Sequence, residues 1–425
     1  MSTLLMLLLK ASYRRNIIMN EKHMMDGFRV LDFTQVVAGP TATRLMAEMG
    51  AEVIKVELGP MGDVTRVLPT EKNGMTSAFL QQNRGKKSLG INPKTEKGRE
   101  IIEKLITKCD VLIENYAAGV IGRMGFPYER VKEINPKIVM CSISGFGQTG
   151  PLSNKPGYDF VGAAYAGVLD NIGYPDGSPV IPQLAIGDTA TGVHALAAIN
   201  TALLYRERTG KGQYIDISLI DSYFHMHDTA VQLHSGTGGE FIPKRSGHHH
   251  FVLSTLGVYK GKGDDEYYCI IVLPTRWADL CSFLGRPEYA EDPRFSTNDA
   301  RMENQELVVD FIEGWLRAQP SREVILEKFE EGRFAIAPVL SVPEAMKHPH
   351  FVERRVVRKV KDRSFGEIEI TGMPLRFSEF PEELTLEAPY LGEHNSAILG
   401  DLLSMDEQEI DALTSEGVLH GVGSA

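Results

Sequence analysis

The sequence predicts an α/β protein with a largely parallel sheet, and three observations carry this prediction. Short apolar runs typical of buried strands alternate with stretches whose apolar residues recur at helical spacing. Gly, Asn and Pro residues mark the boundaries between these segments. A polar, glycine-rich stretch at 235–247 separates this alternation from a second set of strands and helices. We therefore expect a large parallel-sheet domain and a smaller α+β domain.

The large domain opens with a strand at 28–33, where apolar and β-favouring residues dominate. A helix at 41–49 follows, and Gly50 supplies the left-handed residue that often closes a helix. Asn135 and Pro136 break the chain before another buried strand. The remaining expected elements are strands at 52–56, 111–113, 138–143 and 214–217, and helices at 94–108, 189–208 and 219–234.

The smaller domain is expected to begin within the 235–247 stretch. It holds strands near 258 and at 268–272, then helices at 275–284, 300–318 and 322–329. Strand-like segments at 355–360 and 367–371 come next, and the chain ends in helix. The predicted ranges are a leader at 1–25, a large domain at 26–234, a linker and small domain at 235–340, and a return segment at 341–425 that completes the large domain.

The leader carries an apolar run at 4–9 that is too short to span a bilayer and lacks the basic flank of a secretory signal. Lys10, Arg14 and Arg15 faintly resemble a mitochondrial presequence. Several methionines precede the first strand, which favours a disordered or mis-started leader. We therefore expect a cytoplasmic protein, or a mitochondrial-matrix protein if the leader is a presequence.

The charge balance excludes two classes of partner. With 45 Lys and Arg against 56 Asp and Glu, the net charge is −11, so no overall field attracts nucleic acid or an anionic membrane. An anionic ligand must instead meet a local basic site. The four cysteines lie far apart without metal-ligand spacing, which predicts reduced thiols in a cytosolic protein and no structural metal.

Two motifs in the sequence are weaker than they look. GFGQTG (145–150) fits the G-x-G-x-x-G pattern, but Pro151 follows where a dinucleotide-binding motif needs a helix. These glycines predict instead a tight turn close to a ligand. The histidines at 248–250 could share one face of a strand, but no Cys or carboxylate stands near them, so a polar loop is favoured over a metal site.

Asp188 lies between an apolar stretch and the long helix, where Asp is a preferred N-cap. Capping is compatible with chemistry, because a helix N-terminus stabilises an ionised carboxylate and keeps it available as a nucleophile. Gly187 beside it is expected to leave room for a substrate carbonyl.

The turn at 35–40 offers backbone groups at the carboxyl end of a strand, where α/β sheets bind ligands. It is otherwise an ordinary turn with Pro40 at the first helical position. Basic residues that could gather around it to hold phosphates, or that are simply solvated, are Arg84, Lys86, Lys87, Lys94, Arg123 and Lys155.

A series of short strings occurs in order along the chain: LDFTQVVAGP (31–40), GAEVIKVE (50–57), NRGKKSL (83–89), DVLIENY (110–116), MGF (124–126), SGFGQTGP (144–151), PGYDF (156–160), GDTATG (187–192) and LGEH (391–394). In this order and spacing they resemble the class III coenzyme A transferases. That family includes formyl-CoA and carnitine CoA-transferases and is related to the 2-methylacyl-CoA racemases. The resemblance extends from Gly27 to about Leu403.

The resemblance implies a Rossmann-like large domain, a small domain, and a homodimer whose two chains interlock like rings. It implies that coenzyme A passes from an acyl-CoA to a carboxylic acid through a covalent aspartyl-CoA, with no prosthetic group. Asp188 matches the nucleophile of the family, and Tyr158 and Asp159 match a pair beside it. Positions that match coenzyme A contacts are Val37, Ala38, Lys94, Asn115, Tyr116, Arg123, Met124 and Lys155.

The family's mobile glycine-rich loop over the active site aligns with Gly247, His248, His249 and His250. Three histidines thus stand where the family has a flexible loop. The acceptor acid is accordingly left open among oxalate, succinate, a hydroxy acid, another dicarboxylate and a betaine.

Racemase chemistry is the main alternative, and it needs an acid and a base on opposite sides of an α-carbon. The racemase branch has a histidine in a G-H-D motif where this chain has Tyr158. A phenol, with an ordinary pKa of about 10, is a poor base near neutral pH. The remaining alternative is a coenzyme A-binding protein without catalysis, which the intact segment around Asp188 disfavours.

Overall fold

The computed structural model describes residues 23–381 and 383–421. Most of the leader predicted at 1–25 lies outside the described residues. The side chains of His23 and Met25, at its end, are each 6% exposed. His23 Nδ1 lies 2.7 Å from the Met49 carbonyl, and the Met25 N–H donates to the same oxygen at 2.8 Å. The folded part of the chain therefore begins before Asp26.

The chain divides into two compact units. The first comprises the described residues up to Ala166, Gln183–Met226 and the residues from His350 onward, and the second comprises Gly167–Pro182 and His227–Pro349. The predicted boundaries after 234 and 340 thus differ from the observed changes at 226 and 349. The helix predicted at 219–234 is also interrupted at the first of these changes, because α9 (Leu219–His225) ends there and α10 (Ala230–Gly236) is a separate helix.

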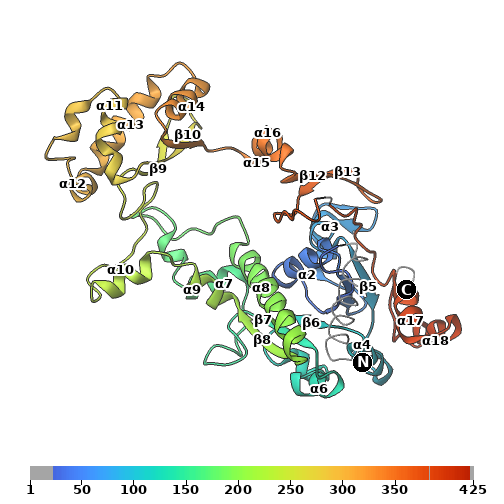
Figure 1. Ribbon diagram of the computed structural model, residues 1–425. Coiled ribbons are helices and arrows are strands. Elements are labelled where there is room, and N and C mark those ends of the chain that lie inside the picture. The colour runs from blue at the N-terminus through green and yellow to red at the C-terminus, as the bar shows by residue number, and fades with distance from the viewer. Residues whose placement is uncertain (1–22, 382, 422–425) are drawn as a thin grey trace, which may run out of the picture. The chain divides into compact units, whose positions relative to one another are not determined.

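A six-stranded parallel sheet forms the centre of the first unit, as the alternation predicted (Figure 1). Its strand order is β5-β2-β1-β6-β7-β8, so the chain runs outward from β1 on one side and outward from β6 on the other. All five predicted strands of the large domain are present, and β5 adds an edge strand that was not expected. The strands are β1 (Arg29–Asp32), β2 (Glu52–Glu57), β5 (Lys86–Gly90), β6 (Val111–Glu114), β7 (Val139–Ser144) and β8 (Gln213–Ser218).

Two apolar cores involve the sheet. In one, α2 (Ala38–Glu48) and α8 (Ile186–Thr209) pack together, and Figure 1 shows them side by side. Gly192 allows this approach, since a Cβ there would lie 2.4 Å from the Ala38 carbonyl oxygen. The other core joins α4 (Glu96–Ile106) to two helices of the return segment, α17 (Asn395–Leu403) and α18 (Glu407–Ser415). The carboxyl-terminal part of the chain therefore completes the first unit.

Shorter elements complete the first unit. Two antiparallel hairpins, β3–β4 and β12–β13, lie outside the main sheet. These elements are η1 (Val64–Val67), β3 (Glu71–Lys72), β4 (Met75–Thr76), α3 (Ser77–Asn83), α5 (Val120–Arg123), α6 (Tyr128–Ile134), α7 (Asp159–Tyr165), β12 (Val357–Asp362) and β13 (Gly366–Thr371), with α16 (Pro349–Glu353) at the boundary.

The second unit is α+β, with a three-stranded antiparallel sheet in the order β11-β10-β9. Its core contains Tyr259, Tyr268, Trp277 and Phe329. The helix predicted at 300–318 is divided at Asn304 into two helices. The elements are η2 (Leu169–Asn171), β9 (Leu256–Lys260), β10 (Tyr267–Ile271), η3 (Pro274–Arg276), α11 (Trp277–Phe283), η4 (Pro287–Ala290), α12 (Asn298–Glu303), α13 (Gln305–Arg317), α14 (Arg322–Glu331), β11 (Ala335–Pro338) and α15 (Val342–Lys347).

Two helices of the first unit begin earlier than predicted. Helix α2 starts at Ala38 rather than at 41, so Pro40 is its third residue and not its first. This position is tolerated because the first-turn N–H groups of a helix need no intrahelical acceptor. Helix α8 starts at Ile186 rather than at 189. None of the helices within the described ranges is both long and apolar enough to cross a lipid bilayer.

Candidate functional site

A cleft of about 420 Å³ opens at the carboxyl ends of β1, β6 and β7. It lies where the strand order reverses between β1 and β6, which is the usual ligand site of an open α/β sheet. Many of the residues that the sequence singled out meet there. They are Val37, Ala38, Asn115, Tyr116, Lys155, Tyr158 and Asp188.

The turn between β1 and α2 forms one wall of this cleft. Asn115, just after β6, fixes the turn because its amide donates to the Gln35 carbonyl at 2.8 Å and accepts from the Gln35 N–H at 2.7 Å. Val36 has a φ of 66°, a left-handed conformation that a β-branched residue rarely adopts. Helix α2 then begins without a side-chain cap. This wall therefore contains a strained turn that Asn115 holds in place.

A pair of glycines forms another part of the cleft. A Cβ at Gly145 would lie 2.7 Å from the Cα of Gly157, so the two loops approach at backbone distance. Both residues line the cleft. The next helix after GFGQTG is α7, which begins only at Asp159. The glycines thus make a close turn beside the cleft, and the helix that a dinucleotide-binding motif needs does not follow them.

Asp188 lies in the first turn of α8, and its predicted capping role is wrong. Ala185 is the N-cap residue, and no side chain caps the helix from within its own sequence. Asp159 acts from the start of α7 instead, because its Oδ1 accepts the Asp188 N–H at 3.1 Å. The same oxygen accepts the Tyr223 hydroxyl at 2.8 Å. A second carboxylate therefore stabilises the helix end, and the Asp188 side chain lines the cleft.

Gly187 also has a different role from the one expected. A Cβ at this position would lie 2.0 Å from the Tyr223 ring and 2.4 Å from Asp159 Oδ1. The missing side chain thus makes room for these two residues rather than for a substrate carbonyl. Nothing in the local sequence indicates Tyr223, which lies in α9 and meets Asp159 only in the folded chain.

Burial, and to a smaller extent the nearby charge of Asp159, together raise the pKa of Asp188 to about 7. We expected the helix N-terminus to favour ionisation. That effect is small, about 0.3–1 kcal/mol, so the loss of solvation outweighs it. Asp188 is therefore a carboxyl group that changes charge near neutral pH, as groups in active sites often do.

A second hollow of about 750 Å³ lies in the same unit and contains Lys94, Arg123 and Met124 from the predicted coenzyme A contacts. Its lining includes one further cation, Arg99, and no carboxylate. The chain from 115 to 125 passes from the cleft to this basic hollow, since residues up to Ala118 line the former and residues from Val120 line the latter.

Arg99 was not predicted from the sequence as a site residue. It lies in α4 shortly after Lys94, and its guanidinium donates to the Lys94 carbonyl at 3.0 Å. Its position five residues after Lys94, a predicted contact residue, could have indicated Arg99 as a further cation of the site.

Three of the basic residues thought to gather around a phosphate do not do so. Arg84 and Lys86 are buried at 1% and 3% exposure, and they pair with Glu48 and Asp32 inside the protein. Lys87 pairs with Glu52 at 2.6 Å. The alternative prediction, that these side chains are solvated, is also wrong for Arg84 and Lys86. Lys86 begins strand β5, Arg84 lies just before it, and both are buried.

Residues 247–250 belong to the second unit, where backbone hydrogen bonds pair them with the neighbourhood of β9. His249 forms an antiparallel bridge with Gly257 of β9, and the His250 N–H donates to the Leu256 carbonyl at 2.8 Å. His248 Nε2 lies 2.5 Å from the Tyr174 hydroxyl. Within residues 23–381 and 383–421, no group of three or more His, Cys, Asp or Glu side chains is arranged to hold a metal ion.

Comparison with known proteins identifies related sequences along most of the chain. A sequence profile described as CoA-transferase family III matches residues 25–395. A formyl-CoA:oxalate CoA-transferase from Streptomyces avermitilis is 35% identical over 93% of this chain and 99% of its own length. The human succinyl-CoA:glutarate CoA-transferase is 34% identical over 94% of this chain and 91% of its own length.

Solved structures show the same likeness. A crystal structure of a CaiB/BaiF family protein from Brucella suis is 33% identical to this chain, with a TM-score of 0.78. The match covers 89% of this chain and 99% of that protein. This chain therefore shares its fold with an experimentally solved protein.

Proposed function

The chain belongs to CoA-transferase family III, and on this premise we propose that it moves coenzyme A from an acyl-CoA thioester to a free carboxylic acid through a covalent intermediate on Asp188. One observation carries the proposal. Asp188, whose pKa burial raises to about 7, lines a cleft together with Val37, Ala38 and Asn115, which match coenzyme A contacts of the family.

A carboxylate nucleophile suits this exchange because each step replaces one acyl bond by another. The Asp188 carboxylate attacks the donor thioester, the C–S bond breaks, and a mixed anhydride and the CoA thiolate result. The thiolate attacks the Asp188 carbonyl and releases the donor acid, which leaves an aspartyl-CoA thioester. The acceptor carboxylate then attacks that thioester, and the released thiolate takes the acceptor acyl group from the second anhydride. Asp188 is regenerated, and no external energy source is consumed.

The two hollows suit the two ends of coenzyme A. In the proposal, Lys94, Arg99 and Arg123 bind the phosphates in the basic hollow, and the thioester lies in the cleft beside Asp188. The segment 115–125, which lines both, then follows the connecting arm. Coenzyme A is a substrate here, and the proposal includes no prosthetic group.

The decisive experiment is a panel of acyl-CoA donors and free acids, with products identified by mass spectrometry. The panel includes formyl-CoA and succinyl-CoA with oxalate and glutarate, because the named relatives use these compounds. Formation of a new acyl-CoA supports the proposal. Coenzyme A binding without exchange for any pair would contradict it and favour a non-catalytic binding protein.

The same preparation separates transfer from racemisation. A chiral 2-methylacyl-CoA incubated in deuterated water should gain no deuterium at its α-carbon, because Tyr158 stands where the racemase branch has histidine. Rapid α-deuteration would overturn the assignment to transfer alone.

The proposal also includes an interlocked homodimer, following the family resemblance. Apolar side chains exposed along α8 are consistent with a protein partner, namely Ile186, Val193, Leu204 and Tyr205, which are 39–52% exposed in the single chain. Linked rings cannot separate without opening, so sedimentation at low concentration should show a dimer. A folded, active monomer would exclude the interlocked form.

We place this dimer in the cytoplasm, in keeping with four cysteines that are all free.

A further inference from the structure

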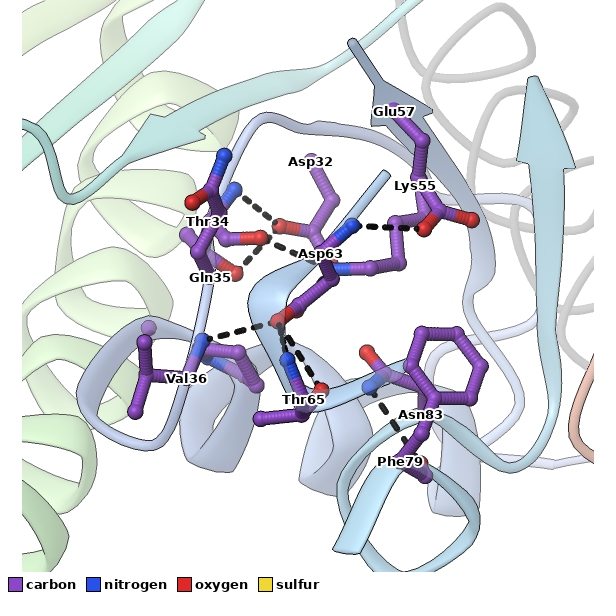
Figure 2. Close-up of polar contacts among 12 residues, drawn as sticks. Asp32, Thr34, Gln35, Val36, Lys55, Glu57, Asp63, Thr65, Phe79 and Asn83 are labelled. Atoms are coloured by element: carbon purple, nitrogen blue, oxygen red, sulfur yellow. Dashed lines mark hydrogen bonds and ion pairs between the residues drawn. The ribbon is translucent and has the colours of Figure 1, made fainter. Parts of the chain in front are cut away.

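We propose that Asp63, acting together with Lys55, is a positioning residue that holds Val36 in its left-handed conformation and thereby sets the wall of the cleft that Asp188 also lines. Figure 2 shows the arrangement, with Asp63 between Lys55 and the turn that carries Val36. Asp63 lies outside the cleft lining, so it acts through the turn and not by contact with substrate.

The turn after β1 is held almost entirely by side chains from other segments. Its consecutive backbone groups, from the Thr34 N–H to the Val36 N–H, each have a side-chain partner. The Thr34 N–H donates to Asp32 at 2.8 Å, the Thr34 carbonyl accepts from Lys55 Nζ at 2.7 Å, both Gln35 groups bond to Asn115, and the Val36 N–H donates to Asp63 Oδ1 at 3.3 Å. The backbone groups of this turn are thus paired with polar side chains that are buried or, for Asn115, half-buried.

Asp63 is itself fixed by its surroundings. Its Oδ2 forms an ion pair with Lys55 Nζ at 2.9 Å, and both side chains are fully buried. Its Oδ1 accepts the Thr65 N–H and hydroxyl, each at 2.9 Å, besides the Val36 N–H. Burial alone would raise the pKa of Asp63, but the Lys55 ammonium and the bonds from Thr65 lower it to about 2. The carboxylate is therefore charged at neutral pH and well below it.

Val36 is the residue for which this support matters. Its φ of 66° is unfavourable for a β-branched side chain and persists only when neighbouring contacts enforce it. Val36, Val37 and Ala38 all line the cleft, and α2 starts immediately after the turn. A relaxation of Val36 would displace these backbone groups with respect to Asp188.

The test is a double-mutant cycle between Asp63→Asn and Val36→Gly. Asp63→Asn removes the charge that binds Lys55, so we expect kcat/KM to fall about 10- to 100-fold, mainly in kcat, because misplacement of a cleft wall by about an ångström has effects of this size. Glycine adopts a positive φ without strain. In the Asp63→Asn background, Val36→Gly should therefore restore most of the lost kcat and raise the melting temperature, although Val36→Gly alone lowers kcat modestly.

Thr65→Val is the matched control, because it removes one hydrogen bond to the same Asp63 oxygen and none to the turn. It should lower the melting temperature with little effect on kcat. Additive effects of Asp63→Asn and Val36→Gly on kcat, or a folded Asp63→Asn protein with unchanged kinetics, would overturn the proposal. If Asp63→Asn alone does not fold, a double variant that folds supports it, and a double variant that also fails overturns it.

The kinetic readout rests on the proposed function, so the unmodified protein is assayed first. If it transfers no coenzyme A in the panel, the proposed function fails, and the positioning role is then judged from the melting temperatures of the same cycle. If it is active and the cycle is additive, only the positioning role fails.

Discussion

The cleft and the basic hollow lie in one unit, but the residues that line them differ in burial and in charge. Around the cleft, the Asp188 N–H donates to Asp159, and the N–H of Val36, in a strained turn, donates to buried Asp63. The hollow is lined by Lys94 and Arg123, whose side chains are exposed, and no carboxylate faces them from its lining.

This difference separates reactivity from affinity. Burial of Asp188 raises its pKa, which affects the rate of a chemical step that uses this carboxylate. Solvated cations on long flexible side chains attract anions without constraining them closely. Substitutions in the cleft should therefore change kcat, whereas substitutions in the hollow should change KM.

The largest expected effect is at Asp188 itself. Asp188→Ala should reduce transfer on the order of 10⁴-fold or more, because the variant lacks the carboxylate that we propose forms the covalent intermediate. The affinity for coenzyme A, measured by calorimetry, should remain within about threefold, since the side chain lies outside the basic hollow. Substantial residual turnover in a variant with the melting temperature of the unmodified protein would reject Asp188 as the nucleophile.

Next in size are the cations of the hollow. Lys94→Gln, Arg99→Gln and Arg123→Gln should each raise KM for the acyl-CoA about 5- to 20-fold and leave kcat almost unchanged, because each removes a charge-assisted contact that we propose with phosphate. The dependence of KM on salt should also weaken. Lys104→Gln, on the same helix as Arg99 but outside the hollow lining, is the control. A fall in kcat as large as the rise in KM would contradict the prediction that the hollow affects only the binding of the acyl-CoA.

The pH dependence gives a smaller effect. In the proposed mechanism Asp188 attacks only when ionised, and its pKa is raised to about 7, so kcat/KM should rise with pH through about 7 and then level off. Asp159→Asn removes the neighbouring charge and should move this midpoint downward, which increases the rate at pH 6 several-fold relative to the plateau of the same variant.

A Glu114 variant is the control in that experiment, because burial raises the pKa of Glu114 to about 7 as well. Glu114→Gln should leave the midpoint in place. If instead the midpoint disappears in Glu114→Gln and is unmoved in Asp159→Asn, the titrating group is Glu114 and not Asp188.

The smallest predicted effect concerns the second unit. Replacement of His248, His249 and His250 by glycine should change the preference among acceptor acids about two- to tenfold, with coenzyme A affinity unchanged, because the family resemblance assigns this segment to the acyl end of the substrate. Competition between two acids in one reaction, followed by mass spectrometry, measures the change. An unaltered product ratio would remove the segment from acceptor selection.

Several features of this protein could be predicted from the sequence. The alternation of apolar runs and helical patterns correctly predicted the parallel sheet, because burial on both faces of a strand leaves a local record in residue type. The order of the motifs indicated the family, and several residues that the family resemblance singled out, from Val37 to Asp188, line one cleft in the structure.

Other features were decided only by tertiary structure. The expected cap at Asp188 is supplied by Asp159. Arg84 and Lys86, which were predicted either to hold phosphate or to be solvated, pair inside the protein. The pKa of Asp188 moves upward rather than downward. Gln35 meets Asn115 at a separation of 80 residues, and Val36 meets Asp63 at a separation of 27. Local sequence determines which segments are buried, but the partner that satisfies a buried polar group, and hence its charge, depends on which distant segment the fold brings beside it.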